Sequence, residues 1–323
     1  MTKRRRLCWS GLLTLFAAVS PAAGADYPVK PVKIITQAAA GSGPDVIGRI
    51  VADQLGRQLK QPVLIVNHAG AGGLIAAQIA AAADPDGYTL YMPSASALMV
   101  LPETHAKLSF SFDRDFVPIG MIGQQPMLIT ASSRLGVSTL PELIALAKKR
   151  PGELLFAGNT PGTVPTLTGE MLKRRADIDM TFVSYPGAAA ALKDVAGGQI
   201  SVIVESAAGL LGAITGGIVK LVAVGSEQRM TQFPDVPTVA ETLPDFRATG
   251  WFALMARRGT PNEVVQKISR ELRTALQNKE LREKFAKLGT EATPMSPQEL
   301  HDFVETEKKN WIPLVRQTLV KAQ

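Results

Sequence analysis

The sequence predicts an α/β protein of two lobes joined by a hinge. Short β-branched or apolar runs alternate with helical stretches along most of the chain before Trp251, which is the pattern of a parallel sheet with crossover helices. The 298 residues from Asp26 onward (323 − 25) are enough for two lobes, since single cores stop growing near ~250 to 300 residues. Helices return after the last expected strand, so the second lobe is expected to be inserted in the first. Such an insertion needs two chain crossings, and two crossings make a hinge.

The expected strands are short and follow one another at regular intervals. They cover residues 32–36, 63–66, 88–91, 128–130, 154–157, 181–183, 200–204 and 221–224. A helix follows the first strand, with Ser42 as its N-cap and Pro44 and Asp45 in its first turn. Helices are also expected over 140–149, 167–174 and 188–195. After Trp251 the pattern indicates helices alone, over 262–278, 279–288, 297–310 and 311–320.

The first residues have the pattern of an export signal. Basic residues at positions 3–6 precede an apolar run over 12–19 and small residues at 23–25, so residues 1–25 are expected to be a signal peptide cleaved before Asp26. The apolar run is far shorter than the ~20 residues that a membrane helix needs, and no later segment approaches that length. Cys8 precedes the run, so lipid attachment through it is not expected. The mature chain is therefore expected to be exported and soluble.

The composition excludes several classes of function. Cys8 is the only cysteine, and its loss with the signal leaves no disulfide, thiol catalyst or thiolate metal site. Without the four basic residues of the signal, 31 basic residues (35 − 4) face 28 acidic ones, a net charge of +3 (31 − 28). This balance does not favour nucleic acid as a partner. We expect neither a metal nor a cofactor.

Two turns along the chain share one design. The strand at 32–36 leads into Ala40-Gly41-Ser42-Gly43-Pro44-Asp45, and the strand at 154–157 leads into Gly158-Asn159-Thr160-Pro161-Gly162-Thr163-Val164-Pro165. Each turn aims the unpaired N–H groups of a helix start beyond the end of a strand, and that geometry suits an anion. One such turn is more often a tight connection without a ligand, but two matched turns in two lobes would hold an anion between them.

Nucleotide sites do not fit these turns. The first turn lacks the Gly-Lys-Ser/Thr ending of a phosphate loop, and Asn67 follows the second strand where a dinucleotide fold has an acidic residue. Other strand ends offer weaker candidates. The glycines of segment 67–73 could line a ligand site or simply allow close packing of a helix on a strand. Ser94 could donate to a ligand or simply form a turn. Tyr185 and Glu205 are assigned to the site only because they hold equivalent strand-end positions in the second half.

Catalysis has little support in the sequence. The three histidines are far apart, and no zinc-protease, nucleophile-elbow or phosphate-loop motif is present. His301 and Glu305 have helical spacing, for which a solvated helix pair is the commoner explanation. We therefore expect a protein that is not an enzyme. The alternative from that class is a secreted hydrolase or isomerase with Asp45 or Glu205 as its base.

The chain resembles the periplasmic solute-binding receptors of tripartite tricarboxylate transporters, the Bug-type receptors. The resemblance covers nearly all of the mature chain and depends on the order and spacing of many short segments. These are residues 27–32, 41–45, 67–73, 85–90, 140–143, 161–163, 188–192, 221–224, 234–241, 251 and 259–261. It implies an α/β, two-lobed periplasmic binding protein of type II-like fold, with a hinge and a ligand cleft between lobes. We place lobe 1 at 26–125 plus 247–323 and lobe 2 at 126–246.

The resemblance also implies where a ligand is held. In the family, a first loop (here residues 37–45) and a second loop (here residues 159–163) hold a carboxylate through backbone amides, hydroxyls and water. Departures from the family pattern fall in or beside these loops, at Gln37-Ala38, Ser42, His68, Thr160 and Thr166-Leu167. The expected ligand-binding residues are Gln37, Ala39, Ala40, Gly41, Ser42, Asp45, Ser94, Asn159, Thr160, Gly162, Thr163, Thr166, Tyr185 and Glu205.

The function implied is that of an extracytoplasmic, periplasmic receptor. It would capture a small carboxylate (a di- or tricarboxylate, an aromatic acid or an acidic amino acid) and deliver it, as a monomer, to the membrane subunits of a transporter. Whether an amine on the ligand pairs with Asp45 or Glu205 stays open. An alternative reading is ligand-binding input to a membrane sensor kinase, because a sensor would read the same closed shape.

Overall fold

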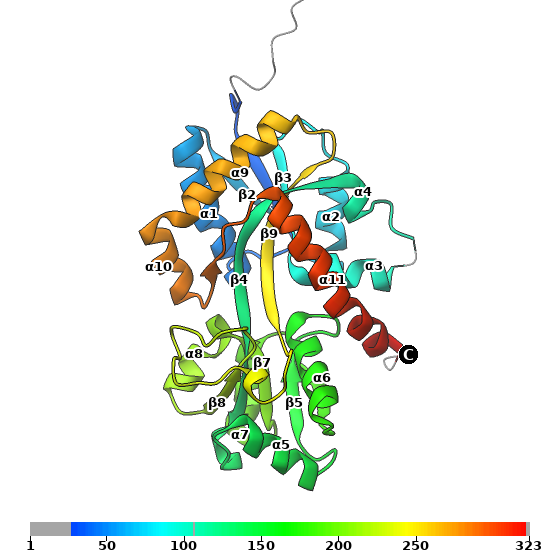
Figure 1. Ribbon diagram of the computed structural model, residues 1–323, viewed down its shortest axis with the longest axis vertical. Helices are drawn as coiled ribbons and strands as arrows, with labels where there is room; N and C mark the ends of the chain where they lie inside the picture. The colour runs from blue at the N-terminus through cyan, green and yellow to red at the C-terminus, as the bar shows by residue number, and fades with distance from the viewer. Residues whose placement is uncertain (1–26, 106, 321–323) are drawn as a thin grey trace, which may run out of the picture.

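The computed structural model describes residues 27–105 and 107–320, which form two lobes around one ten-stranded mixed sheet (Figure 1). The strand order is β2-β1-β3-β9-β4-β7-β5-β6, with β8 and β10 paired to β4 off this path. The expected signal peptide and its cleavage site lie outside the described residues. No helix within the described ranges is long and apolar enough to cross a membrane.

Lobe 1 lies above the junction in Figure 1. Its strands are β1 (Val32–Thr36), β2 (Val63–Asn67), β3 (Thr89–Met92), β9 (Thr249–Arg257), β10 (Glu291–Ala292) and the first part of β4 (Phe116–Ser132). The helices α1 (Gly43–Leu59), α9 (Asn262–Gln277) and α10 (Lys279–Lys287) cover one face; α2 (Leu74–Ala81), α3 (Ala95–Thr104) and α11 (Pro297–Val320) cover the other. Neighbouring strand residues alternate between these faces, with Ile34 packed on the α1 side and Ile35 on the α2 side.

Lobe 2 has the same plan. Its strands are β5 (Leu155–Gly158), β6 (Thr181–Ser184), β7 (Val202–Ser206), β8 (Val219–Val224) and the second part of β4. The helices α5 (Leu140–Lys149) and α6 (Val164–Ala176) cover one face, and α7 (Ala188–Gly197) and α8 (Ala207–Thr215) cover the other. A short helix α4 (Phe112–Asp115) and the 3-10 turns η1 (Ala71–Gly73), η2 (Ser133–Leu135) and η3 (Val239–Glu241) complete the described elements.

The strand β4 passes through both lobes without a break. From Phe116 to Pro126 it pairs with β9, and from Met127 to Ser132 it pairs with β7 and β8. The chain returns at Ala248, whose backbone bonds Met127 and Gly225 beside that change of partner. Because these segments are continuous across the junction, our division at 126 and 246 stays a prediction.

Most predicted elements are confirmed to within a few residues, but the predictions around the junction were wrong. The strand at 128–130 is only a late part of the 17-residue β4, and Pro118, Gly120 and Gly123 earlier in β4 lie at irregularities in its pairing with β9. Trp251 begins no all-helical region, since it lies inside β9. The sheet is mixed because β9 and β4 are antiparallel to their neighbours. The helices 297–310 and 311–320 form one helix around Pro313.

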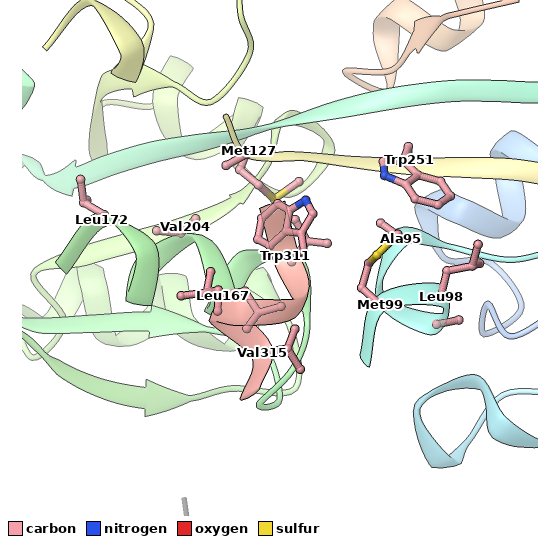
Figure 2. Close-up of a cluster of buried hydrophobic side chains, with 14 of the residues drawn as sticks. Ala95, Leu98, Met99, Met127, Leu167, Leu172, Val204, Trp251, Trp311 and Val315 are labelled. Carbon is pink, nitrogen blue, oxygen red and sulfur yellow. The ribbon is translucent and has the colours of Figure 1, made fainter. Parts of the chain in front are cut away.

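The helix α11 braces the junction. It packs on β4 and reaches α3 in lobe 1 and α6 in lobe 2. In Figure 2, Trp311 of α11 lies between Leu167 and Met127 on one side and Met99 of lobe 1 on the other. The indole N–H groups of Trp251 and Trp311 both donate to Oε2 of the buried Glu307, at 2.8 and 3.1 Å. A single apolar cluster with one polar centre therefore spans both lobes.

Glu307 gives this brace a testable pH dependence. Burial raises the pKa of Glu307 above its usual 4.5, against the lowering effect of Trp251 and Arg247, so the folded state holds the proton more tightly than the unfolded state. Its contribution to stability therefore falls as the pH rises through and above ~4.5. Glu307→Gln keeps an acceptor oxygen and has no charge to bury. We expect it to raise the free energy of unfolding, relative to the unchanged protein, more at about pH 8 than at about pH 4.

Urea unfolding at both pH values measures this difference. Glu283→Gln, on the exposed side of α10, is the matched control and should show the same small change at either pH. If Glu307→Gln changes the free energy of unfolding equally at the two pH values, the pKa of Glu307 does not differ between the folded and unfolded states.

Candidate functional site

The strand registers bring the two predicted turns to the same place. In lobe 1, β1 and β3 run parallel, and Ser94 just beyond β3 bridges Phe252 near the start of β9. In lobe 2, the last residue of β7, Ser206, lies opposite Met127, the first residue of β4 past the junction. The carboxyl ends of the parallel strands of both lobes therefore face the junction, and the loops that follow them open onto it.

Close contacts across the junction agree with this placement. Gly162 of the second loop lies against α3 of lobe 1, so near that a Cβ on it would be 2.9 Å from Cγ1 of Val100. Gly162 also has a φ of +83°, a conformation that suits glycine. On the other side of the sheet, a Cβ on Gly289 of lobe 1 would collide with Ala207 of lobe 2. Both positions need glycine because the lobes approach closely.

Asp45 organises the first loop from inside. Its side chain is buried, and it accepts hydrogen bonds from the Gly41 N–H at 2.8 Å, from Nε of Arg49 at 2.9 Å and from Nδ2 of Asn67 at 2.8 Å. Asn67 also donates to the carbonyl of Ala38 and accepts from Arg49. The loop is therefore tied to the ends of β2 and α1, and both oxygens of Asp45 are used within lobe 1.

The charge of Asp45 is stabilised where it lies. Burial alone raises the pKa of this carboxyl, but the hydrogen bonds from Arg49, Asn67 and the Gly41 backbone outweigh burial, and the pKa lies below its usual 3.8. Asp45 was expected in the site from the sequence, but Arg49 and the role of Asn67 were missed. The available signal was the asparagine that ends the second strand.

The first loop keeps several polar groups free of protein partners. Gln37 donates through Nε2 to Oγ of Ser94 at 2.6 Å and accepts from the hydroxyl of Tyr91 at 3.3 Å, so the Ser94 hydroxyl proton is left to donate elsewhere. We had expected Ser42 to cap α1, but its Oγ makes no capping bond and is buried without a partner. Within the described chain, no protein acceptor is found for the N–H groups of Ala39, Ala40, Gly43 and Asp45.

The second loop is held by its own threonines. Oγ1 of Thr163 donates to the carbonyl of Thr160 at 2.8 Å, and Oγ1 of the buried Thr166 donates to the carbonyl of Asn159 at 2.9 Å. The hydroxyls of Thr163 and Thr166 are thus committed to the backbone of the turn. Among residues 27–105 and 107–320, no acceptor is found for the N–H groups of Thr160, Gly162, Val164 and Thr166.

The remaining predicted residues divide into two groups. Glu205 accepts from Nδ2 of Asn159 at 2.9 Å and from the Ser206 N–H at 2.7 Å, so it lies beside the second loop. The Tyr185 hydroxyl instead donates to Asp194 at 2.5 Å, a bond that raises the pKa of Tyr185 to about 12. That hydroxyl is committed to α7 and is not brought to the loops.

Other features of the described residues do not compete with this site. They contain no group of histidine, cysteine and carboxylate side chains that fits a metal ion. A hollow of about 800 Å³ lies between the 226–232 segment of lobe 2 and α10 and β10 of lobe 1, and none of the predicted ligand-binding residues lines it.

The chain is similar to one receptor family over most of its length. The model for "Tripartite tricarboxylate transporter family receptor" matches residues 47–319. The protein BugT of Bordetella pertussis is 34% identical over 324 aligned positions, which cover 99% of this chain and 99% of BugT.

Solved structures show the same fold. The R. palustris protein Rpa4515, solved with adipate, superposes with a TM-score of 0.80 at 26% identity, over 90% of this chain and 98% of that one. MatC of Rhodopseudomonas palustris, solved with bound malate, superposes with a TM-score of 0.76 at 29% identity, over 90% of this chain and 100% of that one.

Replacement of Asp45 tests its organising role. Asp45→Asn puts an amide NH₂ where donors now meet a carboxylate, so at least one donor loses its acceptor, and we expect a loss of about 1–3 kcal/mol in the free energy of unfolding. The pKa of Asp45 is lowered, so its stabilisation is present above ~3.8 and is lost as the pH falls through its folded-state pKa. The deficit of the variant should therefore be largest near neutral pH and shrink in acid.

Urea unfolding near pH 7 and near pH 3 measures this deficit. Asp53→Asn, an exposed position on the same helix that pairs with Arg57, is the control and should change stability by less than about 0.5 kcal/mol. If Asp45→Asn is as mild as Asp53→Asn at neutral pH, the first loop does not depend on this carboxylate.

Proposed function

The chain belongs to the family of tripartite tricarboxylate transporter receptors, and from this premise we propose that it captures a small carboxylate between its lobes for delivery to the membrane subunits of such a transporter. The observation that carries the proposal is the pair of loops with free N–H groups, one from each lobe, that open onto the same junction. The family and the fold are those of solute-binding receptors, not enzymes.

Neutral donors are sufficient to hold a carboxylate here. Backbone N–H groups and the Ser94 hydroxyl form charge-assisted hydrogen bonds to an anion, and several such bonds offset the loss of its hydration. The starts of α1 and α6 add the favourable end of the helix dipole. Adipate in Rpa4515 and malate in MatC support carboxylates as the class of ligand.

The two-lobed fold supplies the output of the receptor. A ligand that bonds both loops stabilises the closed arrangement relative to the open one, and the closed surface is what membrane subunits would recognise. The N-terminal pattern and the family support the periplasm as the place of action, with the protein docking reversibly as a monomer. Catalysis by Asp45 receives no support, because its oxygens are used inside lobe 1.

Ligand-dependent thermal unfolding tests the proposal. The mature protein, refolded once to remove carried-over ligand, is unfolded in the presence of mono-, di- and tricarboxylates, aromatic acids and amino acids. A ligand at ~100 times its Kd adds about 2.7 kcal/mol to the free energy of unfolding, so a true ligand should raise the midpoint by a few degrees. The absence of any shift with every carboxylate would contradict the proposal.

A substitution in the first loop locates the effect. Gly43 is the first residue of α1, and a Cβ on it would meet no atom within 4 Å, so Gly43→Leu should fold normally and place its side chain over the free N–H groups. We expect Gly43→Leu to abolish the ligand shift. Gly212→Leu is the matched control, because Gly212 on α8 has the same open space and lies away from the loops. Equal ligand shifts in both variants would place the ligand elsewhere.

A further inference from the structure

Each lobe forms one wall of the junction. The two walls differ in the polar groups that they leave without a hydrogen-bond partner. On the lobe 1 wall, Gln37 already donates to Oγ of Ser94, so the free groups are the Ser94 O–H, the unpaired Ser42 hydroxyl and loop N–H groups, and none of them is charged. The lobe 2 wall has loop N–H groups as well, but it also carries Glu205, a half-buried carboxylate that can only accept. The site therefore has a neutral side rich in donors and a mixed side with an acidic group.

The orientation of Asn159 increases this difference. Because Glu205 is an acceptor at both oxygens, the Asn159 atom at 2.9 Å from it must be the amide nitrogen. The carbonyl oxygen Oδ1 of Asn159 is then the atom left for a ligand. Two acceptors thus lie together beside the start of the second loop, one of them charged.

Glu205 has no cation to balance it. No lysine, arginine or histidine among the described residues lies within ion-pair distance of it. Its bonds from Asn159 and from the Ser206 N–H occupy one position on each oxygen, and a carboxylate has about four. Asp45, the other acidic residue at the loops, differs because it is buried and bonded to Arg49, Asn67 and Gly41.

Charge then restricts the ligand. A dicarboxylate held by the first loop would bring its second negative charge toward Glu205 as the lobes close, and like charges in a partly desolvated site repel. A ligand with an ammonium group at that end would meet two acceptors, Glu205 and Oδ1 of Asn159. An ammonium carries donors and no acceptor, which matches this wall.

We propose that the ligand is a carboxylate that also carries an ammonium group, an amino acid in the broad sense, with Glu205 and Asn159 as the residues that select the ammonium. This inference rests on the proposed function, because it uses the same site. It narrows the ligand from carboxylates in general to zwitterions, and it gives Glu205 a role in specificity without any part in chemistry.

Ligand pairs of matched length test the proposal without any mutation. Isothermal titration of the refolded mature protein compares γ-aminobutyrate with succinate, ε-aminocaproate with adipate, and L-alanine with L-lactate. We expect the ammonium-bearing member of the best-binding pair to bind at least about tenfold more tightly than its partner. A tighter dicarboxylate or hydroxy acid would overturn the inference and leave the proposed function standing. If none of the six compounds binds while another carboxylate of the thermal-unfolding panel does, the inference is overturned and the proposed function stands; if no carboxylate in either experiment binds, the proposed function itself fails.

Glu205→Gln tests the residue. The glutamine has nearly the same shape and keeps one acceptor oxygen for the Ser206 N–H, and the Asn159 amide can rotate to offer its oxygen to the new NH₂ group, so the fold should be retained, as checked by the midpoint of thermal unfolding. We expect about a 10- to 100-fold loss of affinity for the ammonium-bearing ligand, since a bond to a charged group is removed, and no loss for the dicarboxylate.

The control for Glu205→Gln is Glu153→Gln, which removes the same charge from an exposed position of lobe 2. It should leave all affinities unchanged. Equal affinities of the unchanged protein and Glu205→Gln for the ammonium-bearing ligand would overturn the assignment of Glu205.

Discussion

The site depends on one constraint, the unbroken passage of β4 through both lobes. Because β4 bonds β9 before Pro126 and β7 and β8 after it, its hydrogen bonds fix the direction of the strands on either side. The parallel strands of each lobe must then end at the junction, and the loops that follow them must face each other. A break in β4 would leave two separate α/β units whose loops had no common target. The free N–H groups of both loops become a site only through this shared strand.

The second organising effect is the division of polar side chains between structure and ligand. Asp45, Thr166 and Tyr185 have the residue types expected of ligand contacts, yet each is already bonded within its own lobe. Asp45 and Thr166 hold backbone groups of the loops in place, which lets the loops present N–H donors without rearranging when a ligand arrives, whereas Tyr185 bonds the side chain of Asp194. Glu205 retains acceptor positions, and for this reason it is the side chain at which ligand selectivity is expected.

The brace at the junction links the site to the rest of the molecule. The helix α11 reaches both lobes, and Trp251 and Trp311 both donate to Glu307. The two tryptophans belong to one apolar cluster that extends to α3 and α6 (Figure 2). The α3 helix also contacts Gly162 through Val100. Movement of one lobe relative to the other must therefore take place around a packed, partly polar hinge. Discrete open and closed arrangements are the expected result, since close-packed contacts do not deform continuously.

The sequence by itself determined the α/β class, most of the helices and strands of the two lobes, and the two loops, because hydrophobic periodicity and turn residues act over a few neighbouring positions. It did not predict α3, α8 or β9. It did not determine the long strands at the junction, where Pro118, Gly120 and Gly123 of β4 are accommodated by pairing with β9 from far along the chain. Nor did it separate Asp45 from Glu205. A carboxylate is either fully hydrogen-bonded within the protein or left with acceptor positions for a ligand. Which of the two holds depends on partners such as Asn67 and Asn159, and only the tertiary structure brings those partners within bonding distance.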